Sequence, residues 1–426
     1  MGGVSMEWKH YKMDELIEEI SMGPFGSDVK KEFYVDNGVP ILNGSNLQGF
    51  KLQEDSFGYL TKEKADSLKK CNAHRGDIIV THRGTLGQIV YVPVNSKYDR
   101  YVISQSQFRF RCKADLVDVQ YLVYYFHTRE GQYKILANAS QVGVPALARA
   151  TSTFRLIDIK LPPLDDQRRI ASILSSLDRK IELNNKINAD LEEMAQAIFK
   201  NWFVDFEPFK DGKFVDSELG MIPEGWKVGK ITDIGCLITD YVSNGSFASL
   251  KQNVHLYETK EYAQFIRNTD LKTNTFSVYV DKHSYDFLSK STLYGNEIII
   301  SNVGDVGSVH LCPKLDIPMT LGNNIIMLRP NEKEYNYFLY LWFKYFSGQG
   351  LIQGIKGGSA QPKFNKTDFK NLPLLIPSFE IIEKSYWIFE SMFSILSSNI
   401  KENSRLSTLR DTLLPRLMSG EIEVPE

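Results

Sequence analysis

The sequence has few cysteines, and they are widely spaced. Only Cys71, Cys112, Cys236 and Cys312 occur among 426 residues, and no two of them form a Cys-x-x-Cys pair. So sparse a pattern argues against a disulfide framework and against a structural zinc site. Cys71 and His74 have metal-like spacing, but no second ligand pair lies near them. We therefore expect ordinary thiols, no metal and no other cofactor.

Long apolar runs are also missing. No uninterrupted apolar stretch in the sequence reaches the ~18 residues that a membrane span needs. The first 20 residues, "MGGVSMEWKHYKMDELIEEI", lack the apolar segment of a signal peptide. These absences predict a cytoplasmic protein without a membrane partner.

Signatures of catalysis are missing as well. Neither glycine-rich segment continues into the Gly-Lys-Ser/Thr of a phosphate-binding loop. An adenine methyltransferase would need a cofactor-binding glycine motif and an Asn-Pro-Pro-aromatic segment, and "LPPL" at 161–164 is not that segment. We also find no carboxylate–lysine cluster of a nuclease. The sequence predicts a non-catalytic protein; an enzyme with an unrecognised site is the alternative, which methyl transfer by the isolated chain would establish.

Positive charge is scarce for a protein that would hold DNA alone. The net charge is −2, and residues 1–164 carry 21 Lys and Arg against 18 Asp and Glu. Proteins that bind DNA unaided usually have a clear basic excess. If this chain binds DNA, a partner is expected to share the contact.

The sequence does contain one segment that occurs twice. "DIIVTHRGTLGQIV" at 77–90 and "EIIISNVGDVGSVH" at 297–310 match at an offset of 220. Further pairs follow the same order, among them "GPFGS" at 23–27 with "GSFAS" at 245–249, and "YLVYYF" at 121–126 with "FLYLWF" at 338–343. A repeat of this length indicates domain duplication and not a solenoid.

Each half mixes short β-like runs with turn residues and one helical segment, near 118–128 or 335–345, which predicts an α+β fold. The Gly-x-x-Gly segments lie between apolar runs. They fit a tight turn between strands, while a phosphate-binding loop is the sharper alternative. A further alternative is that backbone N–H groups of such a turn contact a DNA phosphate.

A strongly helical segment follows each half. In the first, residues 165–203, an unbroken 4-3 spacing predicts a coiled-coil seam. The same spacing continues in the second helical segment, shifted by 215. Asparagines stand at the centre of both seams: Asn184 and Asn188 in the first, Asn399 and Asn403 in the second.

Buried asparagines cost about 1–3 kcal/mol each unless their amides find partners. An antiparallel arrangement would pair Asn184 with Asn403 and Asn188 with Asn399. A parallel one would align them too, but the duplication favours antiparallel helices, with equivalent halves at opposite ends of one rod. The alternative is that the asparagines face solvent. Pro415 is expected to end the second helix.

Three stretches of the chain resemble the specificity (S) subunits of type I restriction–modification systems. They are "LPPLDDQRRIASILSSLDRKIELNNKIN", "AIFKNWFVDFEPF" with "SELGMIPEGWKVGKI", and "LRDTLLPRLMSGEIEV". The resemblance covers nearly the whole chain. The bare Gly-x-x-Gly contributes little to it, because it is not specific.

The resemblance implies two target recognition domains, residues 1–164 and 207–379, each reading one half of a bipartite site on double-stranded DNA. Helices at 165–206 and 380–426 would hold the half-sites a fixed distance apart as an antiparallel coiled coil with a pseudo-two-fold repeat. The same helices would dock methyltransferase (modification) subunits, and restriction/translocase subunits would join the complex. A protein-assembly scaffold without direct base readout is the alternative function.

Side chains that read DNA must reach base edges or phosphates, so we selected polar residues at matching places in the halves. In the first half the DNA-binding candidates are Ser27, Lys30, Asn43, Ser45, Asn46, His82, Arg83, Thr85, Gln105 and Arg149. In the second half they are Ser249, Lys251, Arg267, Asn268, Thr269, Asn302, Asp305, Asn323, Gln361 and Lys363. Arg109 and Arg111 alternate with phenylalanines, which fits a half-buried strand better than a nucleic-acid contact. Tyr121, Tyr124 and Tyr125 are expected in the core.

Overall fold

The structure is a computed structural model that describes residues 8–140, 143–358 and 361–424. The chain divides into two compact units: residues 1–183 with 402–426, and residues 184–401. Each unit contains one globular domain and part of each of two long helices, and each is described by itself. Within the described residues, no helix combines the length and the apolar character that crossing a membrane requires.

The first domain is built on two sheets. An antiparallel sheet has the order β2-β10-β7-β8, with strands β2 (Ile17–Met22), β10 (Gln107–Cys112), β7 (Ile78–Thr81) and β8 (Ile89–Tyr91). A mixed sheet has the order β3-β5-β4-β9-β6, with strands β3 (Tyr34–Val35), β5 (Gly58–Leu60), β4 (Val39–Ile41), β9 (Arg100–Val102) and β6 (Asn72–His74). Only β4 and β9 run parallel among these pairs of described strands.

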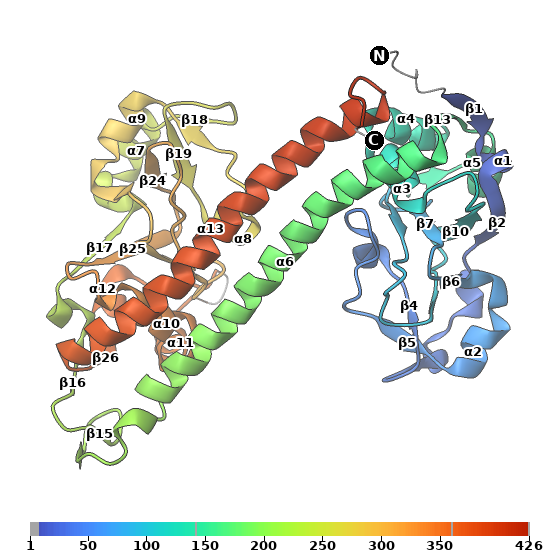
Figure 1. The fold of residues 1–426 in the computed structure, drawn as a ribbon. Coiled ribbons are helices and arrows are strands. Elements are labelled where there is room, and N and C mark those ends of the chain that lie inside the picture. Colours follow the sequence, from blue (N-terminus) through green and yellow to red (C-terminus); the bar gives the residue numbers. More distant parts are fainter. Residues whose placement is uncertain (1–7, 141–142, 359–360, 425–426) are drawn as a thin grey trace. The chain divides into compact units, whose positions relative to one another are not determined.

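Shorter elements complete the first domain (Figure 1). The ribbon of β1 (Lys9–Lys12) with β13 (Asp158–Leu161) joins the two ends of the domain. The hairpin and helices are β11 (Ala139–Ser140), β12 (Ala146–Leu147), α1 (Met13–Leu16), α2 (Lys62–Ser67), α3 (Val119–His127), α4 (Arg129–Leu136) and α5 (Ala150–Arg155). Single-turn 3-10 helices are η1 (Gly26–Asp28), η2 (Lys31–Phe33), η3 (Gly44–Leu47) and η4 (Lys69–Cys71).

The second domain repeats both sheets. The antiparallel sheet has the order β17-β25-β22-β23, with strands β17 (Cys236–Asp240), β25 (Ile325–Pro330), β22 (Ile298–Ser301) and β23 (Val309–Leu311). The mixed sheet has the order β18-β20-β19-β24-β21, with strands β18 (Leu256–Tyr257), β20 (Tyr279–Val280), β19 (Ala263–Ile266), β24 (Met319–Leu321) and β21 (Thr292–Leu293). The parallel pair recurs as β19 with β24. The predicted duplication and the α+β class are confirmed.

The remaining elements of the second unit follow the same plan. The ribbon of β16 (Lys227–Lys230) with β26 (Pro373–Ile376) corresponds to β1 with β13. The helices are α7 (Phe247–Asn253), α8 (Asn268–Thr273), α9 (Lys282–Phe287), α10 (Tyr335–Lys344), α11 (Phe346–Gly354) and α12 (Lys366–Lys370). Short pieces are β14 (Phe214–Val215), β15 (Ile222–Pro223), η5 (Glu207–Phe209), η6 (Ile231–Ile234), η7 (Tyr241–Asn244) and η8 (Ser289–Ser291).

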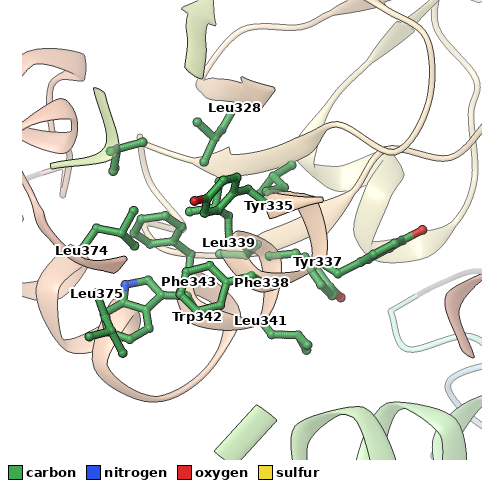
Figure 2. Close-up of a cluster of buried hydrophobic side chains, with 14 of the residues drawn as sticks. Leu328, Tyr335, Tyr337, Phe338, Leu339, Leu341, Trp342, Phe343, Leu374 and Leu375 are labelled. Carbon is green, nitrogen blue, oxygen red and sulfur yellow. The ribbon is translucent and has the colours of Figure 1, made fainter. Parts of the chain in front are cut away.

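The core of each domain forms around one apolar helix, α3 or α10. Helix α3 begins where the Asp118 carboxylate accepts a hydrogen bond from the Tyr121 backbone N–H over 2.9 Å. Tyr121, Tyr124 and Tyr125 are all buried, as predicted. Figure 2 shows the equivalent core of the second unit, where the aromatic side chains of α10 lie between Leu328 and the leucines of β26. A helix that is apolar on all sides has to be buried.

The two long helices are α6 (Leu164–Phe203) and α13 (Phe379–Met418). Within the first unit, Asp178 pairs with Arg410 over 2.6 Å and Lys180 with Glu402 over 3.2 Å. A later residue of α6 therefore pairs with an earlier residue of α13, so the two helices run antiparallel. In the second unit Ala195 and Phe389 share one buried cluster, which fits the same direction. The antiparallel prediction is confirmed inside each unit.

The asparagines of the seam are not solvent-facing. Asn399 Nδ2 donates a hydrogen bond to Asn188 Oδ1 over 2.9 Å, which is the predicted partner. Asn184 is fully buried. The Asn184–Asn403 pairing would join residues of different units and stays a prediction.

Pro415 does not end α13, contrary to the prediction. The helix continues to Met418 with the proline inside it. Proline removes one helical hydrogen bond, but Leu414, Leu417 and Met418 are buried in the core of the first unit. Burial of these side chains offsets the lost bond, so the last turn remains helical.

Candidate nucleic-acid interface

The Gly-x-x-Gly segments are tight turns between strands, which confirms the simpler prediction. In the first domain the turn joins β7 to β8, and in the second it joins β22 to β23. Gly84 and Gly87 have φ of +89° and +82°, and Gly304 and Gly307 have +79° and +94°. Residues with a Cβ rarely adopt these values, which explains the glycine at both positions of each copy.

A glutamine braces each turn, and sequence reasoning missed it. Gln132 Nε2 donates to the carbonyl oxygens of Gly87 (2.9 Å) and Phe126 (2.8 Å). In the second domain Gln349 makes the same two bonds, to Gly307 (2.7 Å) and Phe343 (2.6 Å). The sequence did contain a signal for these glutamines, because both follow a glycine at matching places of the repeat. The brace fixes the first turn to the helix pair α3–α4 and the second turn to the helix pair α10–α11.

A second segment pairs with each turn. The N–H of Gly84 donates to Pro145 O (2.9 Å), and the N–H of Leu147 donates to His82 O (2.8 Å). The second domain repeats the arrangement, with the N–H of Gly304 donating to Pro362 O over 2.9 Å. This pairing places the candidates Arg149, Gln361 and Lys363, which are far away in sequence, on the segment that borders the turn.

The acidic residue that opens the repeated segment has a structural role. Asp77 is fully buried and pairs with Arg111 (2.7 Å) and Arg109 (3.3 Å), while Glu297 pairs with Arg329 (2.7 Å). Arg109 is itself buried on β10. The strand interpretation of the Arg–Phe alternation is therefore confirmed, although Arg109 on the polar face of that strand is buried and Arg111 is partly buried.

Most of the candidate side chains lie at the surface. Those that are exposed are Lys30, Asn43, Ser45, Arg83, Thr85, Gln105, Arg149, Lys251, Thr269, Asp305, Asn323, Gln361 and Lys363. Partly buried are His82, Ser249, Arg267, Asn268 and Asn302. The backbone of Ser27 belongs to η1, and its side chain lies outside what the structure describes.

Asn46 has to be removed from the candidates. Its side chain is fully buried, with Nδ2 donating to Asp55 O (2.7 Å) and Oδ1 accepting from the Asn43 N–H (2.9 Å). It holds the loop together and cannot reach a base. The equivalent pair in the second domain is Asp270 with Arg267, whose guanidinium donates to the buried carboxylate over 2.6 Å. That hydrogen bond raises the pKa of Arg267.

The two turns differ in charge. Thr85 of the first turn corresponds to Asp305 of the second. Asp305 pairs with Lys272 (2.5 Å) and accepts bonds from Ser308 (2.5 Å) and Asn268 (3.2 Å). The Lys272 bond is the main cause that lowers the pKa of Asp305 to about 2. The second turn therefore carries a fixed, internally paired negative charge.

A cavity of about 420 Å³ opens beside the second turn. The candidates Lys251, Asn302 and Asn323 all line it, so the fold brings these three together. Oδ1 of Asn302 is buried and has no hydrogen-bond partner among the described residues. Near the cavity, Lys366 Nζ donates to Asp240 Oδ1 (3.0 Å), a polar contact that the sequence did not indicate.

Comparison with known proteins identifies the family. The family model for the type I restriction modification DNA specificity domain matches residues 6–193 and again residues 223–407. The two matches cover most of the chain and coincide with the structural duplication. The chain therefore belongs to this family, and it is a specificity subunit of a type I restriction–modification system.

Relatives of this chain match along its whole length. It is 28% identical to the MjaIX specificity subunit of Methanocaldococcus jannaschii, over all of this chain and 96% of that protein. It is 25% identical to the HindI specificity subunit of Haemophilus influenzae, over 98% of this chain and all of that one. The crystal structure of the S subunit from M. genitalium has a similar fold, with a TM-score of 0.61 and 18% identity over 97% of each chain.

Proposed function

We propose that each globular domain reads one half of a bipartite DNA target through the surface around its Gly-x-x-Gly turn. One observation carries the proposal. The two domains share strand order, turn and glutamine brace, yet their turn residues differ, as with Arg83 and Thr85 against Val303 and Asp305. A common scaffold with different side chains fits readers of two unlike half-sites, because base identity is read by side chains at base edges.

Four exposed cations fit contacts to the DNA backbone. They are Arg83 and Arg149 in the first domain, and Lys251 and Lys363 in the second. Such contacts fix the position of a protein on the duplex without reading sequence. Arg267 is excluded from this group because its guanidinium is held by Asp270.

We further propose that α6 and α13 set the spacing between the half-sites and dock the modification and restriction subunits. Apolar side chains remain exposed along these helices, and protein partners are expected to cover such positions. They include Leu183 and Met194 on α6, and Trp387, Ile395 and Leu409 on α13. In this proposal the chain itself is non-catalytic, and its partners supply methyl transfer and cleavage.

The experiment is genome-wide mapping of methylated adenines in cells that carry this chain with its modification subunit, against a deletion strain. A two-part motif with a fixed spacer, lost on deletion, is the expected result. A second strain should carry Arg83→Gln with Thr85→Ala. This change should alter one half of the motif only, because the second domain is intact. A continuous motif would refute reading by the second domain. No change in a complex shown to assemble would refute DNA reading by this chain and favour a scaffold.

A further inference from the structure

Two phenylalanine side chains stand exposed at equivalent places of the repeat. Phe25 is 82% exposed and Phe247 is 80% exposed. They occupy the third position of "GPFGS" and of "GSFAS", in which the second and fourth residues differ. A single exposed aromatic residue is ordinary. The same exposed ring in both copies, beside residues that have diverged, calls for a function that the two domains share.

Each ring is presented by a capped helical turn. The Phe25 N–H donates to Asp28 Oδ2 over 3.0 Å, which closes η1. Phe247 is the first residue of α7, where Ser246 Oγ accepts from the Ser249 N–H over 3.2 Å. A backbone fixed in this way holds the ring outward before any ligand arrives, so binding costs little ordering entropy.

The surroundings of both rings belong to the proposed reading surface. Phe247 lines the same cavity as Lys251, Asn302 and Asn323. In the first domain, the residue after Phe25 is Gly26, where an added Cβ would lie 2.5 Å from Gln105 Oε1. Each phenylalanine therefore lies on a segment close to an amide suited to a base edge. Tyr241, Val242, Leu250, Val303 and Ile325 add apolar side chains to the cavity wall, so the Phe247 ring stands in a mixed polar and apolar setting.

Resting on the proposed function, we infer that Phe25 and Phe247 each contact a thymine methyl group in their own half-site. The thymine C5-methyl is the apolar group that a base pair exposes in the major groove. An exposed ring near amides matches it, because the amides can bond neighbouring base edges; beside Phe247, the Lys251 ammonium can also bond a phosphate. Each ring adds an apolar element of specificity to its domain.

The test uses the assembled complex with its modification subunits and a duplex carrying its bipartite site, at one fixed salt concentration. Phe25→Ala and Phe247→Ala should each weaken DNA binding roughly tenfold. Val94→Ala is the matched control. Val94 is 82% exposed, like Phe25, but follows β8 at the end of the β7–β8 hairpin opposite the turn. Its DNA affinity should equal that of the wild type, and all three variants should keep the wild-type melting temperature.

Replacing thymine by uracil, one position at a time, identifies the contact. One uracil in one half-site should weaken the wild-type complex and have no further effect on Phe25→Ala; the other half-site should behave likewise with Phe247→Ala. Equal uracil effects on wild type and variant would overturn the inference, as would unchanged DNA affinity of both variants. Loss of modification-subunit binding would assign the rings to a protein interface instead. A wild-type complex without bipartite preference would refute the proposed function itself, whereas specific wild-type binding with unaffected variants would refute only this inference.

Discussion

Asn399 Nδ2 lies 2.9 Å from Asn188 Oδ1, and this hydrogen bond joins the two long helices within the second unit. Both residues hold seam positions that apolar side chains occupy elsewhere. A paired amide is satisfied there, while a slipped register would leave it against apolar neighbours. The pair thus favours one alignment of α6 with α13.

Breaking this pair on one side should cost more than removing it altogether. Asn188→Leu leaves the Asn399 amide without its partner and should destabilise the protein by about 1–3 kcal/mol. Asn188→Leu with Asn399→Leu should recover wild-type stability or exceed it, at the expense of register. The measurement is the melting temperature in a double-mutant cycle. Additive effects of the two single changes would show that the amides do not interact.

The buried acid of the repeated segment should matter for stability. Asp77→Ala leaves the buried Arg109 guanidinium without one of its partners and should destabilise the first domain by about 3–5 kcal/mol. Glu297→Ala tests the equivalent acid beside Arg329. Asp99→Ala is the control, because its carboxylate is exposed and pairs with Arg75 at the surface. Melting temperatures should fall for Asp77→Ala and stay near wild type for the control.

The two glycines of one turn should respond differently to alanine. Both have positive φ, so either change costs about 1–2 kcal/mol of backbone strain. A Cβ at Gly84 meets open space, but one at Gly87 would lie 2.4 Å from Gln132 Oε1. Gly87→Ala should therefore lower both the melting temperature and the DNA affinity further than Gly84→Ala. An equal fall in melting temperature and DNA affinity for the two variants would argue against the glutamine brace.

Shortening the helices should change the spacer and leave the half-sites intact. Removing four residues from α6 shortens it by ~6 Å, which is roughly two base pairs of DNA. A matched deletion of four residues from α13 keeps the helices equal in length. Mapped methylation sites should show the original half-sites at an altered spacing. An unchanged spacing in an assembled complex would disprove the proposal that the helices set it.

The second domain should lose stability at mildly acidic pH through His310. Burial, aided by Lys344 and Lys272, lowers the pKa of His310 from its ordinary value of 6.5 to about 4. The unfolded chain therefore binds a proton that the folded domain resists, so stability is complete above pH 6.5 and falls as the pH drops towards 4. Because the ring is partly solvated, we expect the free energy of unfolding to fall by about 1–2 kcal/mol. His310→Gln should flatten the change of melting temperature between pH 7 and 5.

Several features of the fold could be predicted because they repeat in the sequence. The match of Asp77 with Glu297 and of the glycine pairs indicated two equivalent domains, and both sheets duly recur in the same strand order. The 4-3 spacing likewise predicted the Asn188–Asn399 pair. Periodicity works here because coiled-coil packing is local and regular along a helix.

The candidate site was less predictable, because burial is a tertiary property. Asn46 and Ser45 look equally polar in the sequence, yet the loop encloses the first and exposes the second. Arg267 resembles a free cation until Asp270 is seen to hold it. Gln132 and Gln349 lie more than forty residues from the glycines that they brace.

By itself, then, the sequence determined that this chain is a duplicated α+β protein with two seam-forming helices, and its motifs indicated the family. Only the tertiary structure decided which polar side chains face outward beside the turns and which make hydrogen bonds inside the protein. The physical reason is that repeats and heptads are patterns along the chain, whereas exposure and partnership depend on segments that meet in space from distant positions. Phe25 and Phe247 are the clearest case, since two exposed rings at one place in each domain emerge only when both domains are folded.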